Sequence, residues 1–168
     1  MSEPTRIDIQ PPCHDTLIFE AIVAAPPEVI FALYADVALR EQWSAPSPTA
    51  IVRYEVADLR SGGCDVYVCG DRDDPQYRGV VHYCDVSAPG RLVFSETISQ
   101  AGQAMFSSLT TWLIEPAHVG SSKLTLTVQL TSLVGPAAAR GVRVGTASML
   151  ANLERLAASR ADLSWPVD

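Results

Sequence analysis

The sequence predicts an α+β protein in which a curved antiparallel sheet of about seven strands carries two short helices and one long C-terminal helix. Between residues 51 and 132, apolar residues recur with a period near two, as they do in strands with one buried face. Short turns rich in Gly and Pro separate these strands, which favours a meander over parallel crossovers. After Gly135-Pro136 the period becomes helical and stays so over about residues 136–160.

A strand and two short helices open the predicted domain. Thr16–Ala24 is rich in β-branched and aliphatic residues and is predicted as the first strand. The segment PPE at 26–28 suits a first helical turn, where the missing N–H of proline costs nothing and a glutamate meets the positive end of the helix dipole. Asp36 is placed to cap a second short helix that ends at Trp43.

The middle of the chain is predicted to form six further strands, at 51–59, 64–70, 77–87, 91–99, 104–115 and 122–132. The last of these alternates aliphatic side chains with Thr and Gln, which is typical of an antiparallel strand with one solvated face. A sheet of this size curls. A helix laid across a curled sheet leaves a hollow beneath it unless large side chains fill the space.

Length and composition predict one domain and limit its partners. The 168 residues are divided into a single domain at 15–162 and short tails at 1–14 and 163–168. A net charge of −7 argues against nucleic acid as a partner. No apolar run approaches the roughly 20 residues of a membrane helix, and no signal peptide is visible, so we expect a cytoplasmic protein that is not bound to a membrane. The four cysteines lack metal-ligand spacing and suit a reducing compartment.

Local motifs spread over residues 16–160 resemble, in their order, those of one superfamily. They are APPEVIF at 25–31, Trp43, SGG at 61–63, Gly79, APGRLVF at 88–94, TW at 111–112, IEP at 114–116, LTLT at 124–127 and ML at 149–150. The chain thus resembles the SRPBCC (START-like, helix-grip) superfamily, and within it the branch of activator-of-heat-shock-protein-90-ATPase homologues. The resemblance implies a helix-grip fold with a cavity for hydrophobic small molecules, as in the superfamily's lipid carriers, hormone sensors, polyketide cyclases and antibiotic-resistance proteins.

Two features differ from that branch. Its members often carry a tryptophan in the first half of the final helix, where this chain has Gly145 and Thr146, and small residues there leave more room under the helix. The eukaryotic chaperone activators also have a separate N-terminal domain, for which 168 residues leave no room. We therefore expect small-molecule binding rather than a chaperone role. The resemblance also implies a connection with stress response.

Two residues on neighbouring predicted strands are candidates for the polar part of a binding site. Val80, Cys84 and Val86 share one face of their strand. If that face is turned to the hollow, the period of two also turns His82 inward and leaves Tyr67 outside. The resemblance instead favours Tyr67 inward, and a β-bulge would reverse the facing, so both residues remain candidates. An imidazole in the cavity could hydrogen-bond a ligand or serve as a general base near neutral pH.

The other predicted ligand-binding residues are three aromatic side chains and three residues on the sheet-facing side of the long helix: Trp43, Phe94, Trp112, Val142, Thr146 and Met149. Flat rings bury much area and suit flat ligands. Glu20 and Glu96 have no visible partner and are interpreted as surface carboxylates. Gly141 and Gly145 are interpreted as positions where the helix approaches the sheet closely.

The chain contains no phosphate-binding glycine loop and no nucleophile elbow, so no catalytic residue, metal or cofactor is assigned. The first hypothesis is a protein that binds a hydrophobic or aromatic small molecule without turning it over. The alternative is an enzyme of the polyketide cyclase or dehydratase kind, in which His82 or Tyr67 moves a proton. A third hypothesis is a protein-interaction module of the co-chaperone kind, and the sequence is also compatible with a homodimer.

Overall fold

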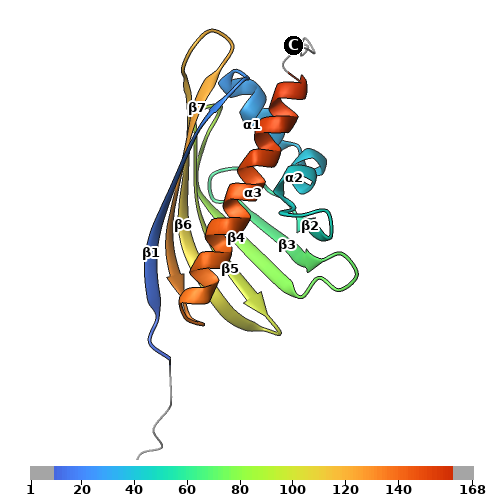
Figure 1. The fold of residues 1–168 in the computed structure, drawn as a ribbon, viewed down its shortest axis with the longest axis vertical. Helices are drawn as coiled ribbons and strands as arrows, with labels where there is room; N and C mark the ends of the chain where they lie inside the picture. The colour runs from blue at the N-terminus through green and yellow to red at the C-terminus, as the bar shows by residue number, and fades with distance from the viewer. Residues whose placement is uncertain (1–9, 161–168) are drawn as a thin grey trace, which may run out of the picture.

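The computed structural model describes residues 10–160, which form seven strands and three helices in the predicted order (Figure 1). The elements are β1 (Cys13–Val23), α1 (Pro27–Ala35), α2 (Val37–Ser44), β2 (Ala50–Val56), β3 (Cys64–Asp71), β4 (Tyr77–Ser87), β5 (Arg91–Gln100), β6 (Gln103–Pro116), β7 (Ser122–Ser132) and α3 (Pro136–Arg160). The predicted α+β helix-grip class is confirmed. The first strand begins three residues earlier than predicted, inside the segment interpreted as a tail. The other proposed tail, 163–168, lies outside the described residues.

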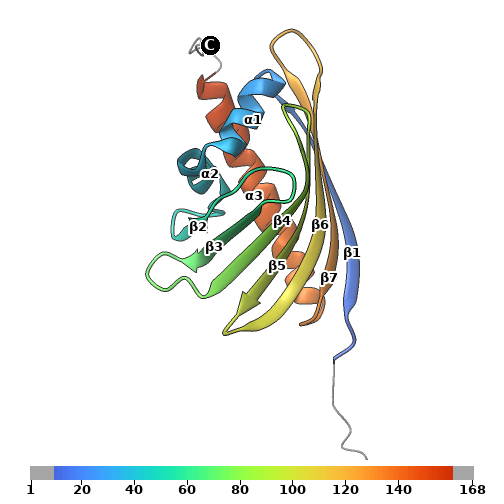
Figure 2. The ribbon, with the colours of Figure 1, turned by 180° about the vertical axis from the view of Figure 1, so that it is seen from behind.

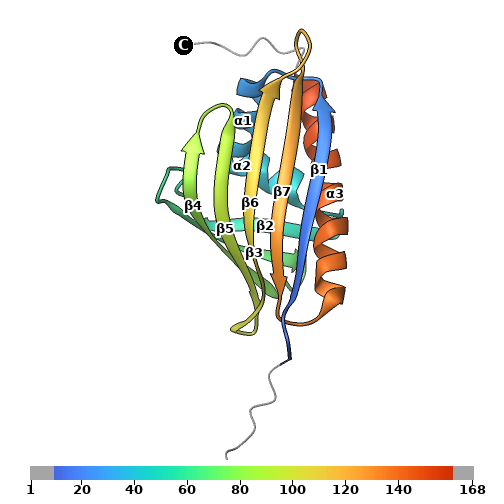
Figure 3. The same cartoon turned by 90° about the vertical axis from the view of Figure 1, so that its left-hand side faces the viewer.

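The seven strands form one antiparallel sheet with the order β1-β7-β6-β5-β4-β3-β2 (Figure 3). Strands β2 to β7 follow one another as the predicted meander, and β1 joins its far edge by pairing with β7. Side chains along β7 alternate between buried and partly exposed, as its sequence predicts. The sheet curves around α3, and its concave face carries the core, which includes Leu17, Trp112 and Leu126.

The two short helices pack beside the C-terminal half of α3, at one end of the sheet (Figure 2). Asp36 caps α2 as predicted, because its Oδ1 accepts a hydrogen bond from the Leu39 backbone N–H at 3.0 Å. The Trp43 indole N–H donates to the Leu33 carbonyl at 2.9 Å, which joins α2 to α1. From α3, the Asn152 amide donates to the carbonyl of Trp43 at 3.2 Å. These contacts fix one end of the long helix.

The two halves of α3 pack very differently. Its buried residues, Leu150, Leu153 and Ala157, all lie in the C-terminal half. In the N-terminal half, no neighbouring atom lies within 4 Å of the place where a Cβ would stand on Gly141 or Gly145. The interpretation of these glycines as points of close helix–sheet approach is therefore wrong. None of the described helices is both long and apolar enough to cross a membrane.

Candidate ligand-binding cavity

A cavity of about 480 Å³ lies between the concave face of the sheet and the helices. Small residues of α3 line one side, including Ala138, Gly141 and Gly145. Aromatic rings supply much of the remaining wall: Tyr34, Trp43, Tyr54, Tyr67, Tyr77, Phe94, Phe106 and Trp112. The hollow lies beneath the N-terminal half of α3, where the helix presents mostly small side chains to the concave face of the sheet.

Seven of the eight predicted site residues lie on the cavity wall: Trp43, Tyr67, Phe94, Trp112, Val142, Thr146 and Met149. Trp43 and Trp112 contact each other with ring centroids 5.9 Å apart. The structure therefore brings together the aromatic residues of the sheet and α2 with the small and flexible residues of α3. Their contact with a ligand stays a prediction.

His82 lies on the opposite, convex face of β4 and is exposed, so the expectation that it faces the cavity is wrong. The cause is a β-bulge at Cys84, where the pairing of β4 with β5 shifts between Tyr83 and Asp85. On one side of the bulge Val81 and Tyr83 face the core, and on the other side Val86 does. The period of two, extended through the bulge from Val86, puts His82 on the wrong face.

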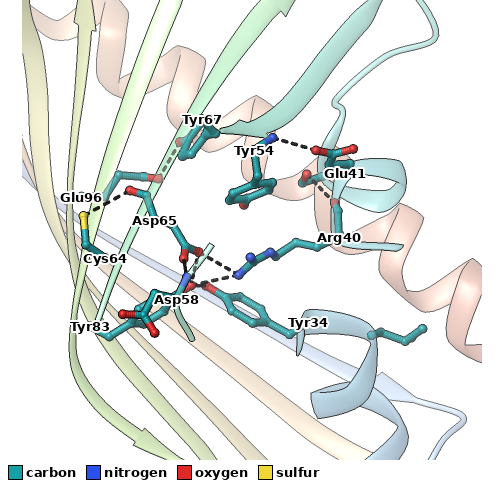
Figure 4. Close-up of polar contacts among 12 residues, drawn as sticks. Tyr34, Arg40, Glu41, Tyr54, Asp58, Cys64, Asp65, Tyr67, Tyr83 and Glu96 are labelled. Carbon is teal, nitrogen blue, oxygen red and sulfur yellow. Dashed lines mark hydrogen bonds and ion pairs between the residues drawn. The ribbon is translucent and has the colours of Figure 1, made fainter. Parts of the chain in front are cut away.

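Tyr67 occupies the inward position, and its hydroxyl donates a hydrogen bond of 2.6 Å to Oε1 of Glu96 (Figure 4). The ring extends from β3 across β4 to reach β5, and it passes over Gly79. A Cβ at Gly79 would stand 2.1 Å from Cζ of Tyr67, so only glycine leaves room for the ring. On its other side, the ring of Tyr54 packs at a centroid distance of 5.3 Å.

Glu96 lies on the cavity wall, and its interpretation as a surface carboxylate is wrong. Burial raises the pKa of Glu96 above its ordinary value of 4.5, and the hydrogen bond from Tyr67 offsets this only in part. The pKa of Tyr67 is also raised, because burial and the nearby carboxylate both oppose a phenolate. Tyr67 therefore stays a hydrogen-bond donor, and Glu96 is a carboxyl group that holds its proton more tightly than an exposed glutamate does.

A second polar cluster lies beneath α1 and α2. Arg40 of α2, only 1% exposed, forms an ion pair of 3.0 Å with Asp65 of β3. The Tyr83 hydroxyl donates to the same carboxylate at 2.6 Å and accepts from Arg40 at 2.9 Å (Figure 4). The Tyr34 and Tyr83 hydroxyl groups are 3.2 Å apart. This cluster ties the short helices to the sheet.

The guanidinium of Arg40 packs against two tyrosine rings and keeps its positive charge. Its guanidinium lies 4.2 Å from the centre of the Tyr54 ring and 4.9 Å from that of Tyr34. Burial by itself would lower the pKa of Arg40, but the tyrosines and Asp65 around the group raise it above its ordinary value. Nε and Nη2 are buried without a hydrogen-bond partner among the described residues.

Sequence reasoning missed Glu96 and Arg40, but a signal for Glu96 was present. Phe94 was predicted to face the cavity, and the period of two from Phe94 turns Glu96 and Ile98 to the same face. The burial of Phe94 and Ile98 and the place of Glu96 on the cavity wall agree with this alternation. No comparable signal marks Arg40, because its partner Asp65 lies on a distant strand.

The curved sheet, the long helix and the hollow between them define a helix-grip protein of the SRPBCC superfamily. A family model described as activator of Hsp90 ATPase homolog 1-like protein matches residues 24–158. The chain belongs to this family, which confirms the resemblance seen in the sequence. No protein of curated function matches it significantly.

Solved structures share the fold over nearly their whole length. The Mll3558 protein from Rhizobium loti is 27% identical, with a TM-score of 0.76 over 87% of this chain and 99% of that one. An uncharacterized protein from Rhizobium leguminosarum is 25% identical, with a TM-score of 0.69 over 86% of this chain and 97% of that one. Protein CV1439 from Chromobacterium violaceum is 19% identical, with a TM-score of 0.74 over 84% of this chain and 96% of that one, and this likeness concerns the fold alone.

Proposed function

We propose that this protein binds a hydrophobic or aromatic small molecule in the cavity between the sheet and α3, without converting it. The observation that carries the proposal is a hollow of about 480 Å³ beneath the unpacked half of α3. Its volume lies within the range of roughly 300–1,000 Å³ found for small-molecule sites, and its mostly apolar wall with a few polar groups is typical of them. An empty hollow lowers the stability of a fold, so a hollow of this size favours an occupant.

Native mass spectrometry of protein purified from its own cells tests this proposal. We expect a retained small molecule that is released on denaturation and recovered chemically unchanged after incubation with fresh protein. A control is the variant Gly145→Trp, whose indole would occupy the hollow and should abolish retention. Protein that carries no adduct and also fails to bind added aromatic compounds would contradict the proposal.

One observation favours a second candidate, an enzyme of the cyclase or dehydratase kind. The Tyr67–Glu96 pair joins a phenol donor to a carboxyl group whose pKa is raised by burial, and such a pair can move a proton on a bound substrate. In that case Glu96→Gln and Tyr67→Phe should each abolish turnover of a polyketide-like substrate while thermal stability is largely kept. Recovery of the substrate unchanged from the wild-type protein would exclude this candidate.

The proposal includes a cytoplasmic location, which the four free cysteines support. The proposal also allows association with a second copy of the chain or with another protein. The convex face of the sheet exposes the apolar side chains of Ile18, Ile22, Leu109 and Leu113. Size-exclusion chromatography with light scattering, alone and with candidate chaperone partners, distinguishes a monomer from a homodimer or an interaction module.

A further inference from the structure

The cavity wall carries one carboxylate that has no cationic partner. Glu96 forms no ion pair among the described residues, and its Oε2 accepts no hydrogen bond from them, while Oε1 accepts only from Tyr67. The other charged residue of the wall, Arg40, is already neutralised by Asp65 at 3.0 Å. The one uncompensated charge that faces the hollow is therefore negative.

This carboxylate is held in a defined position. Gly79 leaves a slot over β4, the ring of Tyr67 fills it, and the Tyr67 hydroxyl binds Oε1 of Glu96. A length of 2.6 Å is typical of a hydroxyl that donates to an ionised carboxylate. Oε2 is left for another donor. The aromatic rings of the surrounding wall add faces that attract cations.

We propose that the ligand of this cavity carries a basic nitrogen on a hydrophobic or aromatic body, and that its ammonium group pairs with Glu96. This inference rests on the proposed function and narrows it to hydrophobic amines. A buried carboxylate without a counter-charge is costly, and an ammonium group removes that cost, whereas a neutral ligand leaves it and an anionic ligand adds repulsion.

Arg40 does not provide a competing anchor for an anionic ligand. Its Nε and Nη2 lack partners, but both atoms are inaccessible from the cavity in this structure. Cζ of the guanidinium lies close to the rings of Tyr54 and Tyr34, and Nη1 is taken by Asp65 and Tyr83. Because Nε and Nη2 are buried, an acceptor oxygen could reach them only if neighbouring groups moved.

Three probes with one aromatic body test the inference: naphthylethylamine, naphthylethanol and naphthylacetate, which are a cation, a neutral molecule and an anion at about pH 7.5. Isothermal titration calorimetry on the wild-type protein should give an affinity for the amine at least about tenfold above that for the alcohol, and the acetate should bind weakest. Glu96→Gln should remove the preference for the amine over the alcohol. Glu55→Gln, which removes an exposed carboxylate, should behave as wild type.

The pH dependence of binding to the wild-type protein gives a second test that requires no variant. The affinity for the amine should fall toward acidic pH as Glu96 becomes protonated, and the affinity for the alcohol should stay constant. The pKa values of Tyr34 and Cys69 are raised to about 12 and about 11, those of Tyr54 and Tyr67 are also raised, and Arg40 stays charged, so none of these groups changes charge between about pH 5 and 8. In the lining, α3 contributes no titratable side chain.

The outcomes separate the two proposals. If the alcohol binds and the amine has no advantage, or if the advantage survives in Glu96→Gln, the amine inference is overturned while the cavity remains a binding site. If none of the three probes binds, the proposed function fails and the inference fails with it. A preference for the acetate would also overturn the inference, because it would make Arg40 rather than Glu96 the anchor.

Discussion

The interior of this protein holds two kinds of buried charge with different consequences. Arg40 and Asp65 compensate each other, and Tyr83 binds both, so their network supports the position of α2 on the sheet. Glu96 has only a phenol as its partner, so its charge opposes folding unless something else occupies the cavity. The ion pair of Arg40 and Asp65 therefore stabilises the fold, whereas Glu96 is suited to pairing with a ligand.

Asp65→Ala is expected to lower the free energy of unfolding by about 3–5 kcal/mol, because it leaves the guanidinium of Arg40 buried without a counter-charge. Urea denaturation measures the change. Glu55→Ala is the control, because Glu55 forms an ion pair with Arg78 in which the two side chains are 42% and 50% exposed, respectively. Its loss should lower the free energy of unfolding by less than about 1 kcal/mol. If Arg40→Met restores none of the stability lost in Asp65→Ala, the uncompensated charge is not the cause.

Glu96→Gln is expected to change how stability depends on pH. Because burial raises the pKa of Glu96, the folded protein binds more protons than the unfolded chain above the ordinary pKa of 4.5, and the free energy of unfolding falls as the pH rises through this window. The variant should therefore be more stable than wild type at about pH 7.5 and should lose this advantage near pH 4.5. Thermal unfolding at both pH values measures the effect, and a difference independent of pH would refute it.

Sequence patterns predicted the positions of some of these residues and missed others, and both outcomes have physical reasons. Phe94 and Trp112 were predicted to line the cavity because they are large aromatic side chains, and both lie on its wall. The period of two holds along β5 from Phe94 to Ile98, where no bulge intervenes. It failed for His82, because one extra residue at Cys84 reverses the alternation without a mark in the composition. Arg40 could not be predicted, since its burial depends on a carboxylate that only the folded sheet brings near.

Among the elements, α3 determines how much empty space the fold keeps. Its C-terminal half is anchored by Leu153 and by the hydrogen bonds of Asn152 to the end of α2. Its N-terminal half presents Gly141, Gly145 and Thr146 to the hollow. The helix and its apolar face were predictable from period alone, whereas the separation between helix and sheet depends on the curvature of the sheet.

Gly145→Trp is expected to reduce the affinity for naphthylethanol by at least about tenfold, because the indole takes the space of the ligand. Gly145→Ala is the matched control. No atom lies near its added Cβ, so it should keep full affinity and raise helix stability by up to about 1 kcal/mol. Calorimetric titration of both variants measures the affinities, and full affinity in a folded Gly145→Trp protein would show that the ligand binds elsewhere.

In the whole molecule, local patterns determined the order of the elements, and tertiary structure determined the hollow. Alternation and turn residues are local, so the strands and helices could be predicted with end errors of a few residues. The cavity depends both on the curvature of a seven-stranded sheet and on the size of the side chains that several elements direct into it. No local pattern determines this combination, although the small residues near Gly145 indicated where the cavity lies.

An occupied cavity should stabilise the whole fold by mass action. Naphthylethylamine at 100 times its Kd is expected to raise the free energy of unfolding by about 2.7 kcal/mol. For a domain of this size, each 1 kcal/mol corresponds to about 2–4 °C in Tm. Differential scanning calorimetry at increasing probe concentration measures the shift, and a Tm that does not change would mean that the probe does not prefer the native state.

The pairing of the first strand with the last also determines when the cavity can form during synthesis of the chain. His14 and Thr131 hydrogen-bond across 117 positions of the chain, so the edge that β1 completes cannot close on the ribosome until β7 has emerged. The roof, α3, is synthesised later still. A nascent polypeptide therefore cannot enclose a small molecule before α3 has emerged and packed on the sheet.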